Sequence, residues 1–446
     1  MLAFSVSEAP EATVALPGAA LIGRLEDACD ALYGQLKADP ADLLIDLSET
    51  TFVEVPTLQY IISLAVSRHR SNRFTRMRIP GGDEGILARD YLRRIEFPQA
   101  VYKATGIRFQ NFVVAEDLQY FKGLGGDQHE LSYSLSKRQR FWRSRSRSET
   151  GASSSMQEGL EEERFWPFTT WPLGEYLDKG RAADEALDDW SVQTVLSVLN
   201  RYLRAPGEVP GASPDKGDLP SAGIYVGSRI VFEAMTNAVR HPGAACVQSA
   251  SVLRTNNKEG VADYQSGHFT MTFWDDGASI IKTLRDAIDK KLDVRYKYPE
   301  SFDTSYRYRF STSESTIAHS PEIVRSAETP TVAMSDDRLL LSAFYPGVTC
   351  DVAGSGHRVT AELSKSEPSL ATQGMGLFAL CRTVIDCFGG TLAVRTGDYF
   401  MNVKAAKSQG CRYDVKVVKK PPYTPPFLGN MLTVRLPLRR QQGRSR

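Results

Sequence analysis

Residues 230–242 read IVFEAMTNAVRHP, and this stretch carries the strongest structural signal in the chain. Its apolar residues recur at helical spacing and form one stripe: Ile230, Ala234 and Ala238. Glu233, Asn237 and His241 follow the same spacing on a neighbouring stripe, so one face of the predicted helix would present a carboxylate, an amide and an imidazole. Pro242 and Gly243 then end the helix.

Three later segments combine strand or helix patterns with glycine or acidic residues. Residues 269–274 alternate apolar and polar side chains, which predicts a strand, and this strand runs into Asp275-Asp276-Gly277-Ala278-Ser279. Gly374-Met375-Gly376-Leu377 precedes a predicted helix to residue 388, and glycines at a helix N-terminus let free N–H groups meet phosphate oxygens. Residues 429–437 (GNMLTVRLP) read as the last strand.

The order of these segments resembles the GHKL ATPases, the Bergerat-fold superfamily of gyrase B, heat-shock chaperone ATPases, histidine kinases, mismatch-repair proteins and anti-sigma-factor kinases. The N box corresponds to Glu233-x-x-x-Asn237-Ala238, the G1 box to Asp275-x-Gly277 and the G2 box to Gly374-x-Gly376-Leu377. The closing strand ends at Pro437. The resemblance covers about residues 185–440 and implies a two-layer α/β Bergerat domain that binds ATP and Mg²⁺.

The resemblance implies a role for each matched polar residue. Asn237 would ligate Mg²⁺ through its amide oxygen, which is a hard donor. Glu233 would act as the general base that orients water or a substrate hydroxyl toward the γ-phosphate. Asp275 would accept a hydrogen bond from the exocyclic amine of adenine, so the site would select ATP over GTP.

The remaining residues that the resemblance places around the nucleotide are Gly277, Ser279, Gly374, Gly376, Leu377 and Thr433. Gly277 would let adenine lie against the backbone, and Gly374 and Gly376 would give N–H groups to the triphosphate, helped by the dipole of the following helix. Ser279 replaces the second glycine of the family's Asp-x-Gly-x-Gly, which restricts positive φ at this position.

Residues 281–373 occupy the lid position of the family and are far longer than an ordinary loop. They contain aromatic and basic stretches at Arg295–Tyr298 and Tyr306–Phe310. Aromatic side chains interleaved with arginine could stack single-stranded nucleic acid, but a protein-contacting strand explains them as well and is favoured for a chain without excess charge. A second insertion, Tyr399–Leu428, separates the last two strands.

The N-terminal part, residues 1–118, reads as a separate α/β domain. A short apolar run at 43–47 predicts a buried strand, and a helix-compatible segment at 58–68 follows. Residues 10–115 resemble the STAS domain of anti-sigma-factor antagonists. Where that family carries a phosphorylated serine, this chain has Glu54-Val55-Pro56-Thr57, which argues against a phosphorylation switch. A plain α/β domain without STAS ancestry is the alternative.

Residues 119–180 form the expected connecting region, in which 143–159 are an Arg/Ser-rich linker. The GHKL domain is expected at 181–440 and a basic tail at 441–446. His129 begins a stretch that superficially matches the phosphoacceptor box of histidine kinases, but the linker and the later proline residues interrupt the required helical hairpin.

Composition narrows the function classes. The 446 residues are 42% hydrophobic and 24% charged with a net charge of +1, so the whole-molecule field would not draw the protein to nucleic acid or to an anionic membrane. Six scattered cysteines argue against a zinc site and a disulfide framework. We found no secretory or membrane-spanning pattern, and the sequence predicts a cytoplasmic protein.

Three functions fit this pattern. The first is a regulatory Mg²⁺-dependent ATPase whose nucleotide state controls the STAS-like unit and a protein partner. The second is a serine or histidine protein kinase of the anti-sigma-factor type, and the third is an ATP-sensing scaffold without turnover. Glu233 favours catalysis, since a carboxylate facing phosphate is unfavourable without a chemical role. Dimerisation on ATP is plausible from the resemblance.

Overall fold

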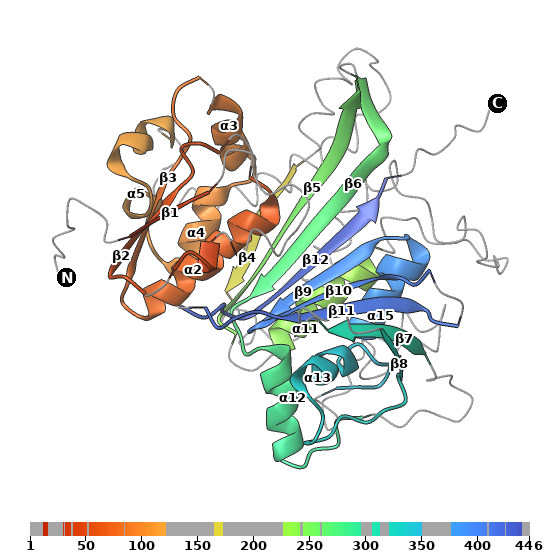
Figure 1. The fold of residues 1–446 in the computed structure, drawn as a ribbon. Helices are drawn as coiled ribbons and strands as arrows, with labels where there is room; N and C mark the ends of the chain where they lie inside the picture. Colours follow the sequence, from red (N-terminus) through yellow and green to blue (C-terminus); the bar gives the residue numbers. More distant parts are fainter. Residues whose placement is uncertain are drawn as a thin grey trace, which may run out of the picture. The chain divides into compact units, whose positions relative to one another are not determined.

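The computed structural model describes residues 12–16, 30, 32–36, 39–50, 53–83, 85–121, 165–172, 226–240, 244–258, 261–295, 306–312, 321–349, 376–407, 410–423 and 425–438. The protein is a mixed α/β structure (Figure 1). It divides into two compact units, one of residues 1–170 with 250–252 and one of the remaining residues. The domain boundaries at 118 and 180 that the sequence suggests stay predictions, and strand β4 (Phe165–Pro172) lies inside the expected connecting region.

The first unit is built on a three-stranded parallel sheet in the order β1-β2-β3. Its elements are β1 (Ala12–Ala15), β2 (Asp42–Asp46), α2 (Val55–Arg70), β3 (Phe74–Arg78), α3 (Ile86–Arg94), α4 (Phe97–Thr105), α5 (Phe109–Phe112) and η1 (Ala115–Phe121). The predicted strand at 43–47 and helix at 58–68 are therefore present as β2 and α2. Helix α2 begins after the extended Glu54 with Pro56 in its first turn, where a missing N–H has no cost.

The core of the first unit depends on one buried arginine. Arg68, in the last turn of α2, is fully buried and ion-paired with Asp39. Its Nε donates to Thr75 Oγ1 at 2.9 Å, and its Nη2 donates to the carbonyl oxygens of Pro40 and Phe74 at 2.8 and 2.7 Å. These bonds join the end of α2 to the residues that precede β2 and begin β3.

The second unit is built on a sheet of nine strands in the order β4-β5-β6-β12-β9-β10-β11-β7-β8, of which residues 165–170 of β4 and 250–252 of β5 are grouped with the first unit. Its further strands are β5 (Cys246–Lys258), β6 (Val261–Asp275), β7 (Arg307–Thr312), β8 (Glu322–Arg325), β9 (Thr391–Thr396), β10 (Tyr399–Ala405), β11 (Tyr413–Lys419) and β12 (Asn430–Pro437). Its helical segments are η3 (Gly227–Val231), α11 (Phe232–Arg240), α12 (Ile280–Asp289), α13 (Asp336–Ser342), α15 (Gly376–Arg382) and η5 (Thr383–Cys387).

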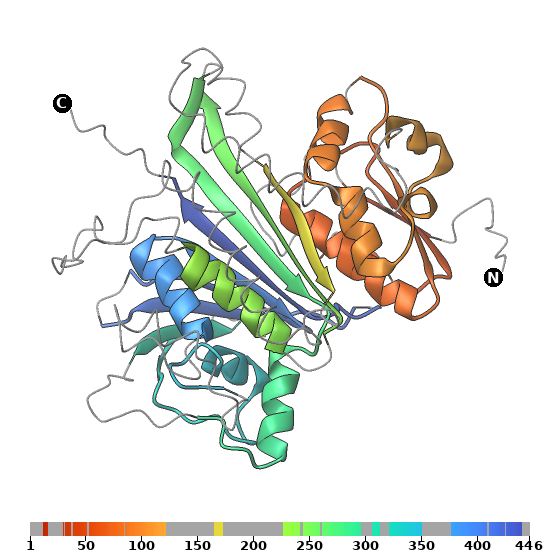
Figure 2. The same cartoon turned by 180° about the vertical axis from the view of Figure 1, so that it is seen from behind.

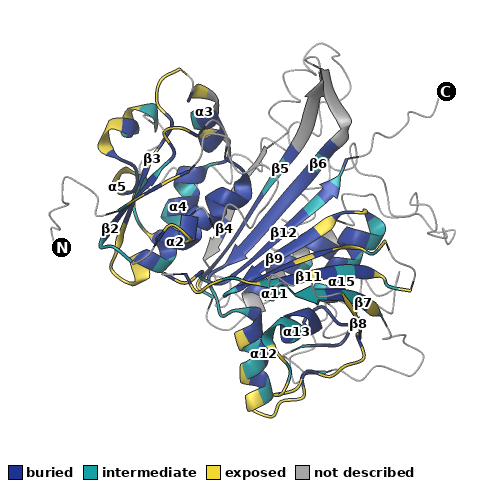
Figure 3. Ribbon diagram, viewed as in Figure 1, coloured by how far each residue is buried: buried dark blue, intermediate teal, exposed yellow. Residues whose placement is uncertain are grey.

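Helices α11 and α15 lie side by side against the sheet (Figure 2). The predicted apolar stripe of α11 is confirmed, because Ile230, Ala234 and Ala238 are all buried. Leu380 and Val384 are buried in the same way on α15 and η5. Figure 3 shows that buried residues continue along β9 and β12, the strands to which η5 packs. Amphipathic helices thus cover a sheet of apolar strands, which is what the sequence pattern predicts.

The described part of the 281–373 insertion belongs to the sheet as well as to the helical layer. Strand β7 pairs in parallel with β11, and β8 pairs antiparallel with β7 at the edge. Tyr308 is 1% exposed, and its ring lies 5.2 Å from that of Tyr345 and 5.5 Å from that of Tyr413. These aromatics form a protein core, so Tyr308 and the buried Phe310 are not available to stack nucleic acid.

The second insertion also joins the sheet. Strands β10 and β11 form an antiparallel pair, and β10 pairs with β9. Strands β9 and β12, which the insertion separates along the chain, are direct neighbours. The insertion therefore extends the sheet outward from β9 toward β7.

Candidate functional site

Helix α11 brings Glu233 and Asn237 against the first residue of α15. A Cβ added at Gly376 would lie 2.8 Å from Glu233 Oε2 and 3.0 and 3.1 Å from the two polar atoms of the Asn237 amide. Both side chains are half-buried, and Asn237 Nδ2 is shielded from solvent without a hydrogen-bond partner among the described residues. Residues more than a hundred positions apart thus meet at one point, and only glycine leaves room for the two polar groups.

The end of β6 holds a second polar group. Asp275 is 2% exposed, and its Oδ1 accepts hydrogen bonds from Gly277 N at 3.0 Å and from Asn430 Nδ2 at 3.1 Å. Asn430 is the register partner of both Asp275 on β6 and Thr396 on β9. Its Oδ1 accepts from Thr396 Oγ1 at 2.6 Å. Three strands therefore contribute one row of hydrogen-bonded side chains, Asp275-Asn430-Thr396.

Burial governs the protonation of Asp275. Removal from water raises the pKa of its carboxyl from 3.8 to about 7, against the lowering effect of the bonds from Gly277 and Asn430; the charge of Asp276 raises it further. A buried carboxyl with this pKa exchanges its proton near neutral pH, and such perturbed groups concentrate at functional sites.

The loop after β6 is tied to the chain that follows α11. Asp276 Oδ1 accepts hydrogen bonds from the backbone N–H groups of Ala245 at 2.6 Å and Cys246 at 2.9 Å. A Cβ at Gly277 would lie 3.1 Å from Ala244 Cβ and 3.0 Å from Asp275 Oδ1. The predicted G1 residues and the exit of the predicted N box are thus in contact.

Gly429 allows β12 to start beside Asp275. Its φ is +80°, and a Cβ there would overlap the backbone carbonyl oxygen of Asp275. A side chain at this position would therefore be strained in its own backbone and would push β12 away from β6. The glycine fixes where Asn430 sits.

Ser279 starts helix α12 in the structure. Its φ of −62° and ψ of 150° are those of a helix N-cap, and its side chain accepts from Lys282 N at 3.2 Å. The next residue, Ile280, donates its N–H to Thr396 Oγ1 at 2.9 Å and to Asn430 Oδ1 at 3.0 Å. The serine in place of the second glycine thus turns the loop directly into a helix attached to the polar row.

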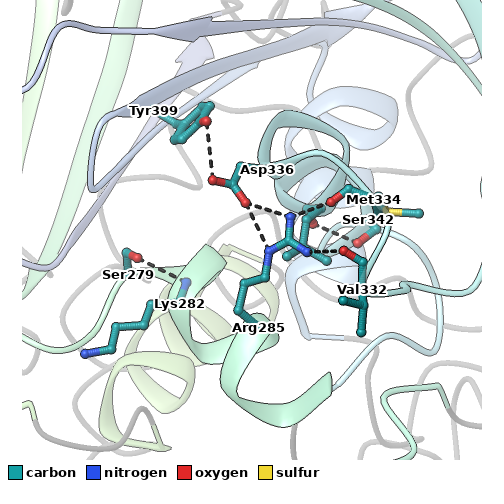
Figure 4. A network of polar contacts seen from close by, with 9 residues as sticks. Ser279, Lys282, Arg285, Val332, Met334, Asp336, Ser342 and Tyr399 are labelled. Atoms are coloured by element: carbon teal, nitrogen blue, oxygen red, sulfur yellow. Dashed lines mark hydrogen bonds and ion pairs between the residues drawn. The ribbon is translucent and has the colours of Figure 1, made fainter. Parts of the chain in front are cut away.

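Helix α12 begins the 281–373 insertion and makes a polar network with a later part of it, residues 332–336 (Figure 4). Arg285 donates through Nε and Nη2 to Asp336 Oδ1 at 3.1 and 2.8 Å, and through Nη1 to the carbonyl oxygen of Val332 at 2.8 Å. Its Nη2 also contacts the carbonyl oxygen of Met334. Arg285 therefore attaches α12 to the segment before α13, and we call this set of contacts the clamp.

Thr433 lies away from the group that we expected it to join. It is 1% exposed, and its hydroxyl lies 3.4 Å from that of Thr272, its register partner on β6. Because side chains alternate along a strand, Thr433 points to the face opposite Asn430 and Asp275. Asn430, not Thr433, is the β12 residue that contacts Asp275.

The remaining expected site residues are either close to Gly376 or outside the described part of the chain. Leu377, second residue of α15, is half-buried next to Gly376. Gly374 and His241 lie outside the described residues. Sequence reasoning missed Asn430 and Thr396, although Asn430 stands beside Gly429 at the start of a predicted strand, where a polar residue before an apolar run is a usable signal.

A divalent cation would find few ligands from the protein alone. Within the described ranges, no three His, Cys, Asp or Glu side chains gather into a metal-binding cluster. The Asn237 amide and the Glu233 carboxylate, both beside Gly376, are hard donors. They suit Mg²⁺, which keeps several waters and takes only one or two protein ligands when phosphates supply the others.

Comparisons with known proteins add no relative. No family model, no curated protein and no solved structure matches the chain. In the part of the chain that the structure describes, every helix is too short or too polar to cross a membrane.

Proposed function

We propose that the second unit is a GHKL-type nucleotide-binding domain that binds ATP with Mg²⁺ and hydrolyses it slowly. The observation that carries this proposal is the meeting of Glu233, Asn237 and Gly376 at one point. Three residue types that phosphate and metal binding require thereby converge from two distant segments.

The base end of the proposed site is the row Asp275-Asn430-Thr396. The ionised carboxylate of Asp275 accepts hydrogen bonds. Asn430 Nδ2 donates one of them and also donates to the carbonyl oxygen of Ala278 at 2.9 Å. The amide of Asn430 is thus fixed, so the Asp275 carboxylate is held in one orientation. An ionised carboxylate held in this way is an acceptor for an exocyclic amine, which adenine has and guanine lacks at the corresponding position.

The phosphate end is the start of α15. The first N–H groups of a helix have no partner within the helix and attract anions. Gly376 begins this helix, and its missing side chain lets Glu233 and Asn237 approach the helix start closely. The bound Mg²⁺ would neutralise phosphate charge, and Asn237 and water would complete its ligands.

Glu233 has the role of proton acceptor in this proposal. Its carboxylate lies beside Gly376, where the phosphates would enter, and it can hydrogen-bond a water and take its proton. The negative charge of Glu233 would repel the phosphates of ATP unless a cation neutralised part of the charge. This repulsion is the reason that the proposal requires Mg²⁺.

The first unit completes the proposal. Its parallel β1-β2-β3 sheet with α2 beside it is compatible with the STAS-like resemblance. We infer that nucleotide occupancy of the second unit controls the binding of a protein partner by the chain, with the first unit as the responding part.

The test is a hydrolysis assay with γ-labelled ATP on the full chain. The wild type should release labelled phosphate only with Mg²⁺, and Glu233→Gln should lower the rate by about a hundredfold or more while retaining ATP binding. Label on the protein would indicate a kinase instead. Binding without turnover in the wild type would contradict the proposed hydrolysis, and absence of binding would contradict the site.

A further inference from the structure

A buried arginine on the reverse face of the sheet has no role in the proposed nucleotide site. Arg395, on β9, is 1% exposed, and its register partners are Met431 on β12 and Phe400 on β10. Both partners are buried and apolar. Because Arg395 directly follows Val394 and precedes Thr396, its side chain points away from the Asp275-Asn430-Thr396 row.

The guanidinium of Arg395 makes no hydrogen bond to any residue that the structure describes. Its Nε, Nη1 and Nη2 are all shielded from solvent and lack a partner. Arginine keeps its positive charge and carries five N–H donors. Buried charges in proteins are normally paired, and a buried polar group without a partner calls for an explanation.

A proline-rich segment covers this charge. Residues 421–427 read PPYTPPF, and we name them the strap. The guanidinium carbon of Arg395 lies 5.2 Å from the ring centre of Tyr423 and 5.5 Å from that of Phe427. Cation–π contacts of this kind are weak compared with the two parallel hydrogen bonds that a guanidinium donates to a carboxylate.

The strap is attached at its two ends. Lys420 N donates to the carbonyl oxygen of Asp398 at 2.8 Å, and the carbonyl oxygen of Leu428 accepts from Trp274 Nε1 at 2.9 Å. Four of the seven strap residues are prolines, which have no N–H to donate to a neighbouring strand. Displacing these prolines from Arg395 would therefore break no hydrogen bond donated by their backbone nitrogens.

We propose that Arg395 and the strap form a binding site for a small organic acid with an apolar or aromatic body. One guanidinium fork matches one carboxylate in both charge and planar geometry, whereas a phosphate dianion would call for further cations. Met431, Phe400, Tyr423 and Phe427 supply apolar surface for the body of the ligand. The carboxylate takes the N–H donors of Arg395, and the strap closes on the ligand.

The site adjoins the polar row through the backbone. Trp274, Met431 and Arg395 are chain neighbours of Asp275, Asn430 and Thr396, so each strand carries one residue of each set on opposite faces. The proposal itself does not depend on nucleotide binding, and its test contains no nucleotide.

The test uses the full chain and sodium benzoate exchanged against sodium chloride at constant ionic strength. The wild type should show a saturable rise in the thermal unfolding midpoint, and hydrogen exchange in a peptide spanning Lys420–Leu428 should change over the same benzoate range. Arg395→Met should abolish both effects, and Arg395→Lys should weaken them. Lys416→Met, at an exposed position on β11, should retain both and controls for loss of a positive charge.

Three outcomes would overturn the proposal. These are no benzoate effect on the wild type, an equal effect in Arg395→Met, and an equal effect of inorganic phosphate on the wild type. If Arg395→Met does not fold, the benzoate and phosphate titrations of the wild type and the benzoate titration of Arg395→Lys still test the proposal. If Arg395 only stabilises the packing of the strap, the thermal unfolding midpoint of the wild type should not depend on benzoate.

Discussion

Asn430 uses both hydrogens and the carbonyl oxygen of its side-chain amide in the interior of the protein. It donates to Asp275 and to the carbonyl oxygen of Ala278, and it accepts from Thr396 and Ile280. A residue with these bonds positions Asp275 and the start of α12 together.

Asn430→Ala should therefore lower the free energy of unfolding by about 1–3 kcal/mol, because buried groups lose their partners. It should also weaken ATP binding. Thr433→Val removes only the 3.4 Å contact between two hydroxyls and is the matched control, with little effect on ATP affinity. Urea unfolding and ATP titration of both variants measure this. Loss of ATP binding in Thr433→Val alone would restore our sequence-based assignment.

The protonation of Asp275 predicts a pH dependence of stability. Its pKa is 3.8 in the unfolded chain and about 7 when buried, so between these values the folded protein binds more protons than the unfolded chain. Stability contributed by this group is complete below about pH 4 and is lost as the pH rises to about 7, with a slope of up to about 1.4 kcal/mol per pH unit. Urea unfolding across this range should show a shallower fall in Asp275→Asn than in the wild type. Equal slopes would contradict the assignment.

Adding a single methyl group at Gly376 tests whether the start of α15 binds the phosphates of ATP. In Gly376→Ala the new Cβ would lie within about 3 Å of the Glu233 and Asn237 side chains, so these two side chains must move from their positions beside the proposed phosphates. We expect ATP affinity to fall by about tenfold or more, which corresponds to about 1.4 kcal/mol. Gly81→Ala is the control, because its Cβ would meet only Tyr120 Oη at 3.9 Å. Unchanged ATP affinity in Gly376→Ala would remove α15 from the site.

At the scale of elements, α12 connects the polar row to residues 332–336 of the insertion. The N–H of Ile280 donates to both Asn430 and Thr396, and Arg285 binds the segment that leads into α13. Arg285→Ala should lower the free energy of unfolding by only about 1 kcal/mol, since Arg285 and Asp336 are 27% and 40% exposed. Hydrogen exchange should nevertheless increase at residues 332–342. Lys282→Ala, on the exposed side of the same helix, should leave that exchange unchanged, and equal exchange in both variants would show that the clamp has no effect.

Local pattern predicted some elements and not others. The stripe of Ile230, Ala234 and Ala238 predicts α11, and the alternation at 269–274 predicts the end of β6, because each depends on neighbours within a few residues. The pairing of β7 with β11 joins Tyr308 to Tyr413, and no short-range pattern reveals such a contact. Asn430 was missed for a related reason, because its role comes from register with Asp275 and Thr396.

At the scale of the whole molecule, the two units should unfold in separate transitions. A core substitution in the first unit should therefore lower the stability of that unit alone. Arg68→Met removes the buried ion pair with Asp39 and the bonds to Pro40 and Phe74, which should cost the first unit about 3–5 kcal/mol. Denaturant unfolding should then show an earlier transition, while stabilisation of the second unit by ATP persists. Arg70→Met, at an exposed position on the same helix, is the control. Loss of ATP-dependent stabilisation in Arg68→Met would show that the second unit needs a folded first unit to bind ATP.

The account depends on one nucleotide site assembled from α11, the end of β6 and the start of α15. Calorimetric titration of ATP into the wild type and Asn237→Ala, each with Mg²⁺ and with a chelator, tests it most directly. We predict that the wild type binds ATP more tightly with Mg²⁺, and that Asn237→Ala loses this gain while retaining the weaker, metal-independent binding. Absence of ATP binding by the wild type, or an equal Mg²⁺ effect in both proteins, would contradict the account.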